Sequence, residues 1–191
     1  MNLQERDTII RTLDAALLVL KGPQDEKGPL SEGLIPESGM DIAYALPNAR
    51  ERGDVAAVRG GIGCPSDLDT SVERIAFGTG EEATRTVLSA MKFDPSIRSV
   101  ATLRCTTEIL DVMEDLFFAV CSFNPQKVPP GISVMEWGVA FCCREGVPDA
   151  IYNEQDSNIE AVVRLLAEDP LRVVNNIIKI SARIQNRAIE S

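Results

Sequence analysis

The sequence predicts an α/β domain with helices on both faces of one sheet. Strand-like and helix-like segments alternate along the 191 residues, which is the pattern of such layered architectures. Residues 77–104 show it most clearly, because a strand end, a glycine turn, a helix and a second strand follow one another there. No internal repeat or long linker interrupts the alternation. We therefore expect one domain over residues 1–191, in which 1–33 form an N-terminal helix and loop.

The helix expected within residues 77–104 begins with sequence signals that conflict in charge and geometry. Gly78 and Gly80 supply the backbone freedom of a sharp turn, and Thr79 with Glu82 three residues later matches a capping box. A helix start flanked by glycine also attracts anions such as phosphate. Glu81 and Glu82, however, place negative charge in the first turn. The sequence therefore predicts a helix start whose charge opposes the anion site that its geometry favours.

Turn residues divide the N-terminal part of the chain into short elements. Apolar residues recur at helical spacing in its first segment, and the later apolar runs are separated by stretches rich in proline, glycine and polar residues. These patterns predict, in order, a helix at 3–21, a loop at 22–33, strands at 42–46 and 55–58, a loop at 63–71 and a strand at 72–77.

Helix caps and apolar runs organise the C-terminal part. Thr106, Ser133 and Asp169 stand where helices begin, Ser133 as part of a second capping box and Asp169 before a proline. The continuous apolar run at 117–123 is typical of a buried strand. The predicted order is a strand at 99–103, a helix from Thr106, a strand at 117–123, a helix at 133–144, a strand at 149–152, a helix at 158–167 and a helix from Pro170.

Composition excludes several classes of function. A net charge of −10 without any basic cluster argues against a nucleic-acid partner. No apolar run is long enough to cross a membrane, and residues 1–20 alternate charged and apolar positions instead of forming a signal peptide, so we expect a cytoplasmic protein. The absence of histidine excludes an imidazole base and a histidine-ligated zinc site, and we predict no metal site.

The five cysteines, at positions 64, 105, 121, 142 and 143, include no CxxC pair. Most of them lie in apolar or helical contexts, which predicts reduced side chains packed in the core of a cytosolic protein. The adjacent pair at 142–143 is typical of packing, and a redox or soft-metal site is the alternative interpretation.

Several runs of sequence together resemble one family. They are the first helix, LIPESGMDIAYALPNA (34–49), DVAAVRGGI (54–62), FGTGEEATRTVLSAMKFDPSIRS (77–99), WG (137–138), GVPDAIY (146–152) and VVRLLAEDPLRVV (162–174). These runs resemble the archaeal-type thiamine-phosphate synthase (ThiN) domain from residue 5 to about residue 180. That domain is found fused behind hydroxymethylpyrimidine phosphate kinase, and elsewhere behind a helix-turn-helix as a thiamine-responsive repressor.

The resemblance implies a fold and a reaction. The fold would be a three-layer α/β/α domain with a mixed sheet, of the class II aldolase-like kind also present at the C-terminus of hydroxymethylpyrimidine phosphate kinase. The reaction would join hydroxymethylpyrimidine pyrophosphate to a thiazole phosphate. No cofactor is evident from the sequence, and a need for Mg²⁺ is left open. The partner would be a small phosphorylated pyrimidine or thiazole ligand, and a homodimer is possible.

The chain departs from the family pattern at the positions that carry charge. The pattern FGASSH places a histidine at the position of Glu82, and VAAVPGRI places an arginine at Gly61. The family's tyrosine falls on Cys105, although Arg104 before it is retained, and its glycine-lysine pair falls on residues 158–159, which are asparagine and isoleucine. One base and two cations are therefore missing and one acid is added. An enzyme that handles pyrophosphate needs such positive charge, so the departures indicate a catalytically degenerate member.

Glu82 and Arg59 are the candidate catalytic residues. Glu82 would act as a surviving general base, or its carboxylate would merely complete the capping box with Thr79. Arg59 lies two residues before Gly61 on the same face of a strand, so it would replace the missing arginine or would be a solvated side chain at a strand end.

The candidate ligand-binding residues lie at strand ends and in the glycine turn. Tyr44 and Asn48 suit a planar aminopyrimidine, and a simple turn at Pro47 is the alternative. Arg104 would bind a phosphate or form a salt bridge, and Arg85 would project toward the turn or into solvent. The predicted set is Tyr44, Pro47, Asn48, Gly78, Gly80, Arg85, Arg104 and Asp149.

Three functions remain open at this point. The first is a degenerate member that binds thiamine phosphate or a related pyrimidine or thiazole phosphate. The second is an active thiamine-phosphate synthase that uses Arg59, Arg104 and Glu82 in altered roles. The third is a change of ligand to a cationic or neutral compound, because the glycine turn is acidic. Residues before 34 offer one helix and not a helix-turn-helix, so direct binding to DNA is not expected.

Overall fold

The computed structural model describes residues 3–23, 28–69, 71–156 and 160–190. Within them a seven-stranded sheet has the order β3-β2-β1-β4-β7-β6-β5. β5 and β6 are parallel and the other neighbours are antiparallel, so the sheet is mixed. The strands are β1 (Ile42–Ala45), β2 (Val55–Val58), β3 (Ile75–Phe77), β4 (Ser99–Arg104), β5 (Val120–Phe123), β6 (Ala150–Asn153) and β7 (Val162–Ala167).

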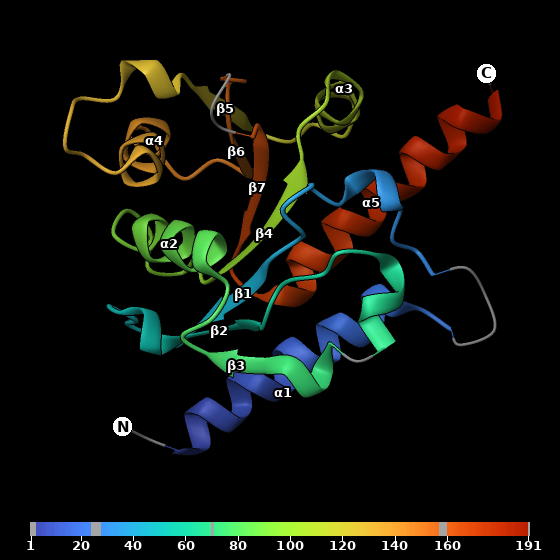
Figure 1. Cartoon of the computed structure of the whole chain (residues 1–191), viewed down its shortest axis with the longest axis horizontal. Coiled ribbons are helices and arrows are strands. Elements are labelled where there is room, and N and C mark those ends of the chain that lie inside the picture. Colours follow the sequence, from blue (N-terminus) through green and yellow to red (C-terminus); the bar gives the residue numbers. More distant parts are fainter. Residues whose placement is uncertain (1–2, 24–27, 70, 157–159, 191) are drawn as a thin grey trace.

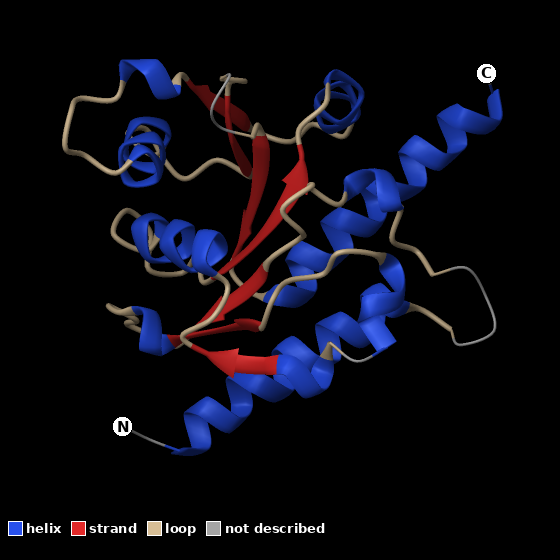
Figure 2. Ribbon diagram, in the orientation of Figure 1, coloured by secondary structure: helices blue, strands red, loops and turns tan. Residues whose placement is uncertain are grey.

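Five α-helices in the described part of the chain form the two outer layers. They are α1 (Leu3–Lys21), α2 (Glu81–Ala90), α3 (Thr107–Asp115), α4 (Val134–Cys142) and α5 (Pro170–Glu190). α1, α3 and α5 cover one face of the sheet, and α2 and α4 cover the other (Figures 1 and 2). The three-layer α/β/α architecture with a mixed sheet agrees with the prediction. No helix among the described residues is long and apolar enough to span a membrane.

Side chains alternate between two apolar cores, one on each face of the sheet. Along β1, Ile42 and Tyr44 join the core beneath α1 and α5, whereas Ala43 and Ala45 join the core beneath α2 and α4. The small alanines let α2 approach the sheet closely. α4 also packs tightly, since a Cβ on Gly138 would lie 2.4 Å from the ring of Phe123.

The predicted helix at 158–167 is wrong. Residues 157–159 lie outside the described part of the chain, and Val162–Ala167 form the strand β7. Every residue of β7 is buried, because the strand pairs with β4 on one side and β6 on the other and is covered on both faces. A buried central strand gives an apolar run that periodicity does not distinguish from a short helix.

Three further predictions are corrected in part. The strand predicted at 117–123 begins at Val120 and is an edge strand, with Val120 37% exposed, so it is not a buried one. The loop predicted at 63–71 contains a 3-10 helix, Pro65–Asp69, and the first half of the strand predicted at 72–77 is a 3-10 helix, Val72–Arg74. The other predicted strands and helices are present, and the helix over 3–21 and the strand over 55–58 have the predicted bounds.

The prediction that the cysteines are reduced is wrong for Cys121 and Cys142, which form a disulfide with their Cα atoms 5.7 Å apart. The bond joins β5 to α4, the two elements at the open edge of the sheet. Cys64, Cys105 and Cys143 are free thiols. Burial raises the pKa of the Cys143 thiol to about 11, so this neighbour of the disulfide is a poor nucleophile at neutral pH.

Replacement of both bonded cysteines, Cys121→Ser with Cys142→Ser, should lower the melting temperature. The bond closes a loop across 21 positions, for which the loss of unfolded-state entropy is worth about 3 kcal/mol, or roughly 6–12 °C for a chain of this size. Calorimetry of the oxidised wild type and the double variant measures the difference. Cys64→Ser, which replaces a free thiol outside the disulfide, is the control, and equal melting temperatures for all three chains would contradict the disulfide's role.

Candidate functional site

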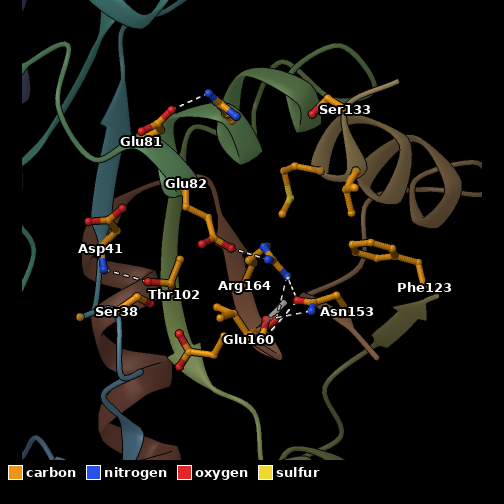
Figure 3. A pocket seen from close by; sticks show the side chains of 15 residues that line it. Ser38, Asp41, Glu81, Glu82, Thr102, Phe123, Ser133, Asn153, Glu160 and Arg164 are labelled. Atoms are coloured by element: carbon orange, nitrogen blue, oxygen red, sulfur yellow. Dashed lines mark hydrogen bonds and ion pairs between the residues drawn. The ribbon is translucent and has the colours of Figure 1, made fainter. Parts of the chain in front are cut away.

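A cleft of about 880 Å³ lies between α2 and α4, over the sheet (Figure 3). Its polar side comes from the segment before β1 and from the start of α2. Its apolar side comes from Phe123 on β5, Val134 and Met135 on α4, and Val162 on β7. The cleft therefore combines a charged wall with an apolar one, as small-molecule sites commonly do.

The start of α2 does not contain the predicted capping box. Gly80 is the N-cap, with φ of 66° and no side-chain cap, and a Cβ there would lie 2.5 Å from the Cβ of Ala57, so only glycine fits. The hydroxyl of Thr79 donates instead to the carbonyl oxygens of Ala57 and Ala76. The carboxylate of Glu82 is thereby left to point into the cleft (Figure 3).

The carboxylate that accepts hydrogen bonds at the start of α2 belongs to Asp41, which precedes β1 in the sequence. Its carboxylate accepts hydrogen bonds from the backbone N–H groups of Glu82 and Ala83, in the first turn of α2. The position that a glycine-flanked helix start offers to an anion is therefore filled by the protein's own carboxylate. Burial raises the pKa of Asp41 above its ordinary value, and the charges of Glu82 and Glu81 raise it further, although the backbone hydrogen bonds act in the opposite direction.

Arg164 forms the floor of the cleft, in the middle of β7. Its side chain is 3% exposed and donates to the side-chain oxygen of Asn153 at 3.0 Å and to the carbonyl oxygen of Val162 at 2.7 Å. Its second terminal nitrogen forms an ion pair with Glu82. Burial lowers the pKa of the Arg164 guanidinium and the charge of Glu82 partly offsets that effect. Arg164 Nε has no hydrogen-bond partner among the described residues.

Negative charge prevails among the described residues that line the cleft. The carboxylates are Asp41, Glu81, Glu82 and Glu160, and the guanidiniums are Arg85 and Arg164. Arg85 is paired with Glu81, and Arg164 with Glu82. Four carboxylates against two guanidiniums leave an excess of two negative charges. No group of three or more histidine, cysteine, aspartate or glutamate side chains in the described ranges is arranged to hold a metal ion.

Two of the sequence-predicted residues, Glu82 and Arg85, line this cleft. Gly80 does not line it, but it is the N-cap of the helix that carries them. Gly78, in the turn before that helix, has φ of 78° and does not line the cleft. Asp149 lies at another cleft near the opposite end of β7, where its carboxylate accepts a hydrogen bond from the backbone N–H of Ala119.

The predicted residues around β1 lie away from the cleft. Tyr44 faces the α1 and α5 layer, is 8% exposed and stacks on the guanidinium of Arg98. Pro47 and Asn48 form an exposed turn after β1, whereas Asp41 precedes that strand, so they lie about 20 Å from it along the extended chain.

The two predicted arginines at other strand ends do not line the cleft. Arg59 is exposed after β2, and its carbonyl oxygen accepts from the side chain of Arg74. Arg104 forms the hydrogen bond from its Nε to the carbonyl oxygen of Ile35. The salt-bridge alternative for Arg104 finds no acidic partner in the parts of the chain that are described.

The polar residues of the cleft that sequence reasoning missed include Asp41, Asn153, Glu160 and Arg164. Arg164 was not predicted as a site residue because its segment was interpreted as a helix, and a single arginine on a helix does not indicate a site. An arginine within the six-residue apolar run VVRLLA was nevertheless a usable signal, since a charged side chain in a central strand is seldom buried without a partner.

Three of the four positions at which the chain departs from the family pattern lie at the cleft or beside residues that line it. A Cβ on Gly61 would lie 3.3 Å from a carboxylate oxygen of Asp41, and Glu82 hydrogen-bonds to Asp41 through its backbone N–H. Cys105 is close enough to Arg164 for the charge of the guanidinium to affect the pKa of the thiol. The fourth departure, at 158–159, lies outside the described residues.

Asp41→Asn should stabilise the protein at neutral pH. Because the pKa of Asp41 in the folded state lies above 3.8, the folded chain keeps this proton to a higher pH than the unfolded chain, and stability falls as pH rises through that pKa. Asparagine avoids this loss and still offers an oxygen to α2. We expect a rise in melting temperature of about 1–4 °C at pH 7, for about 0.5–1 kcal/mol, shrinking toward zero below pH 3.8.

A melting series from pH 3 to pH 8 measures the effect of that substitution. Asp111→Asn, at an exposed position of α3, is the matched control and should leave the melting temperature unchanged. A variant at Asp41 that is less stable than the wild type at pH 7 would show that its charge stabilises the fold.

Comparison with known proteins identifies related chains. The bifunctional thiamine biosynthesis protein ThiDN of Methanocaldococcus jannaschii is 34% identical over 176 residues, which cover 90% of this chain but only 40% of that protein. The crystal structure of the C-terminal domain of protein MJ0236 matches with a TM-score of 0.78 and 31% identity, covering 96% of this chain and 98% of that one.

Two more distant structures share the fold. The C-terminal domain of phosphomethylpyrimidine kinase matches with a TM-score of 0.75 at 24% identity, over 92% of this chain and 100% of that one. L-fuculose-1-phosphate aldolase from Thermus thermophilus matches with a TM-score of 0.53 at 12% identity, over 93% and 94%. The family model of thiamine-phosphate synthase ThiN matches residues 26–179. The chain belongs to the thiamine-phosphate synthase ThiN family, a family of thiamine biosynthesis.

Proposed function

We propose that this chain binds thiamine phosphate, or a related pyrimidine or thiazole phosphate, in the cleft between α2 and α4, and that it does not catalyse its formation. The observation that carries the proposal is the state of the cleft's guanidiniums. Arg85 and Arg164 are each paired with a glutamate, and the lining as a whole is negative. Binding is supported by family membership and by the shape and size of the cleft.

The chemistry of condensation explains why such a cleft is a poor catalyst. A C–N bond forms between the pyrimidine's methylene carbon and the thiazole nitrogen, while the C–O bond to pyrophosphate breaks. Negative charge develops on the leaving group, so the enzyme must supply positive charge or hydrogen-bond donors there. Loss of a single such donor typically costs about 10²–10³ in kcat. Here the start of α2 is filled by Asp41, and the guanidinium on the floor faces Glu82.

Arg85 is the residue that we assign to the ligand's phosphate. Its ion pair with Glu81 is at the surface, where both side chains are more than half exposed, and such pairs are worth only about 0.3–0.5 kcal/mol. A phosphate at the rim of the cleft can therefore replace Glu81 at small cost. The same observation favours the alternative function, an active synthase in which Arg85 takes the pyrophosphate and Glu82 acts as base.

The proposal predicts binding without turnover. Purified chain incubated with hydroxymethylpyrimidine pyrophosphate and the thiazole phosphate, with Mg²⁺ present, should give no thiamine phosphate at ordinary enzyme rates when the products are separated chromatographically. Thiamine phosphate at 100 times its Kd should stabilise the fold by about 2.7 kcal/mol and raise the melting temperature by roughly 5–11 °C. Brisk product formation would favour the active synthase instead.

Arg85→Met tests the phosphate assignment. The substitution should weaken the binding of thiamine phosphate about tenfold and leave the binding of unphosphorylated thiamine nearly unchanged, as measured by calorimetric titration. Arg172→Met is the matched control, because Arg172 also forms an exposed pair with a glutamate four residues earlier but lies outside the cleft. Equal losses for the two variants would place the phosphate elsewhere.

A further inference from the structure

We infer that the cleft recognises its ligand chiefly by positive charge, and that an aromatic ring cation of the thiazolium type, not the phosphate, is the main determinant of affinity. The inference rests on the proposed function and specifies its ligand class. On this basis the cleft favours thiamine and its phosphate over their two anionic precursors, and unphosphorylated thiamine binds at least as tightly as thiamine phosphate.

Two carboxylates of the cleft have no cationic partner among the described residues. Asp41 is held by backbone N–H groups of α2, and Glu160 accepts a hydrogen bond from the backbone N–H of Glu37. These hydrogen bonds orient the two carboxylates. Both line the cleft, and Figure 3 shows them on the same side as Ser38 and Thr102. A ligand cation in the cleft would meet two oriented negative groups.

The apolar wall makes this charge effective. Phe123 and Val162 line the cleft as buried residues, and the half-buried Val134 and Met135 on α4 offer an aromatic ring a surface on which to pack. A ligand packed there displaces water, and an interaction between charges strengthens as the effective dielectric falls. A planar cation gains from both walls, whereas a compact phosphate gains only from Arg85 at the rim.

The buried guanidinium supplies an observation independent of the carboxylates. Arg164 is one of the most deeply buried charged residues, yet its Nε has no acceptor in the described chain, and the residue lines the cleft. A buried donor without an acceptor costs about 1–3 kcal/mol, which a ligand acceptor can recover. An aminopyrimidine ring has nitrogen acceptors, and in thiamine this ring is joined to the thiazolium cation. One ligand therefore meets the acceptor requirement and the charge requirement together.

The electrostatic state of Asp41 agrees with a cationic occupant. Burial and the neighbouring glutamates raise the pKa of this carboxyl, so its charge is unfavourable in the empty cleft. A cation beside it reverses that penalty, whereas an anion increases it. The sequence left open a change to a cationic ligand. Here the cationic group is the thiazolium ring of thiamine phosphate itself, so no different ligand is required.

Calorimetric titration with matched probes tests the inference. One pair is 4-methyl-5-(2-hydroxyethyl)thiazole and its N-methylthiazolium derivative, which differ by one methyl group and one charge. A second pair is thiamine and thiochrome, its neutral oxidised form. Each cation should bind about tenfold more tightly than its neutral partner, and raising the salt from 20 to 200 mM should weaken only the cations. Thiamine should bind at least as tightly as thiamine phosphate.

Variants identify the carboxylates responsible. Asp41→Asn and Glu160→Gln retain a hydrogen-bonding oxygen. Each should weaken the binding of thiamine about tenfold and change the affinity for the neutral thiazole by no more than about twofold. Asp111→Asn and Glu145→Gln remove the same charges at exposed positions outside the cleft and should change nothing. Melting curves of all four variants verify folding, so a lost affinity is not mistaken for a lost fold.

The outcomes separate this inference from the proposed function. Binding of thiamine phosphate with no difference between cationic and neutral probes overturns the inference alone, as does tight binding of thiamine phosphate with none of thiamine. Unchanged thiamine affinity in both Asp41→Asn and Glu160→Gln overturns it as well. If none of the compounds binds, including thiamine phosphate, the proposed function fails and the inference with it.

Discussion

The ion pair between Arg164 and Glu82 is the interaction on which the cleft depends. Arg164 is buried in the middle of β7, where a guanidinium is tolerated only when it is paired and hydrogen-bonded. Glu82 reaches it from the first turn of α2, so the pair fixes this helix against the central strands of the sheet. Removing either partner would leave a buried or half-buried charge uncompensated, which typically costs about 3–5 kcal/mol when the site is fully buried.

Glu82 of this pair also makes the cleft more negative than the family pattern implies, which changes the charge of the ligands that it attracts. The sequence resemblance implies a family pattern with an imidazole where this chain has Glu82 and an arginine where it has Gly61. Gly61 lies beside Asp41 in the structure, with φ of 66° and only 3.2 Å between its would-be Cβ and the carbonyl oxygen of Met40. An arginine side chain does not fit this backbone conformation without strain. The two departures thus act together, because one adds an acid at the cleft and the other removes a cation beside it.

Local signals were sufficient for most of the architecture, β7 excepted, and insufficient for the cleft. The helix starts at Thr106, Ser133 and Pro170 were predictable, because a cap involves residues within one turn of each other. The cap of α2 was not, since its carboxylate belongs to Asp41, some forty positions earlier in the chain. The disulfide was missed for the same reason: the pairing of Cys121 with a cysteine 21 positions later depends on how α4 packs beside β5.

The charge of Asp41 is the observation that most supports the proposed ligand site. The start of α2 needs a hydrogen-bond acceptor, and a neutral amide oxygen would meet that need. The carboxylate adds burial of a charge and repulsion from Glu81 and Glu82, and both oppose folding. Groups held in an unfavourable electrostatic state commonly mark functional sites. A cation that neutralises this charge would remove a cost in folding stability and so gain binding energy. The negative charge of the cleft would then make it specific for cationic ligands.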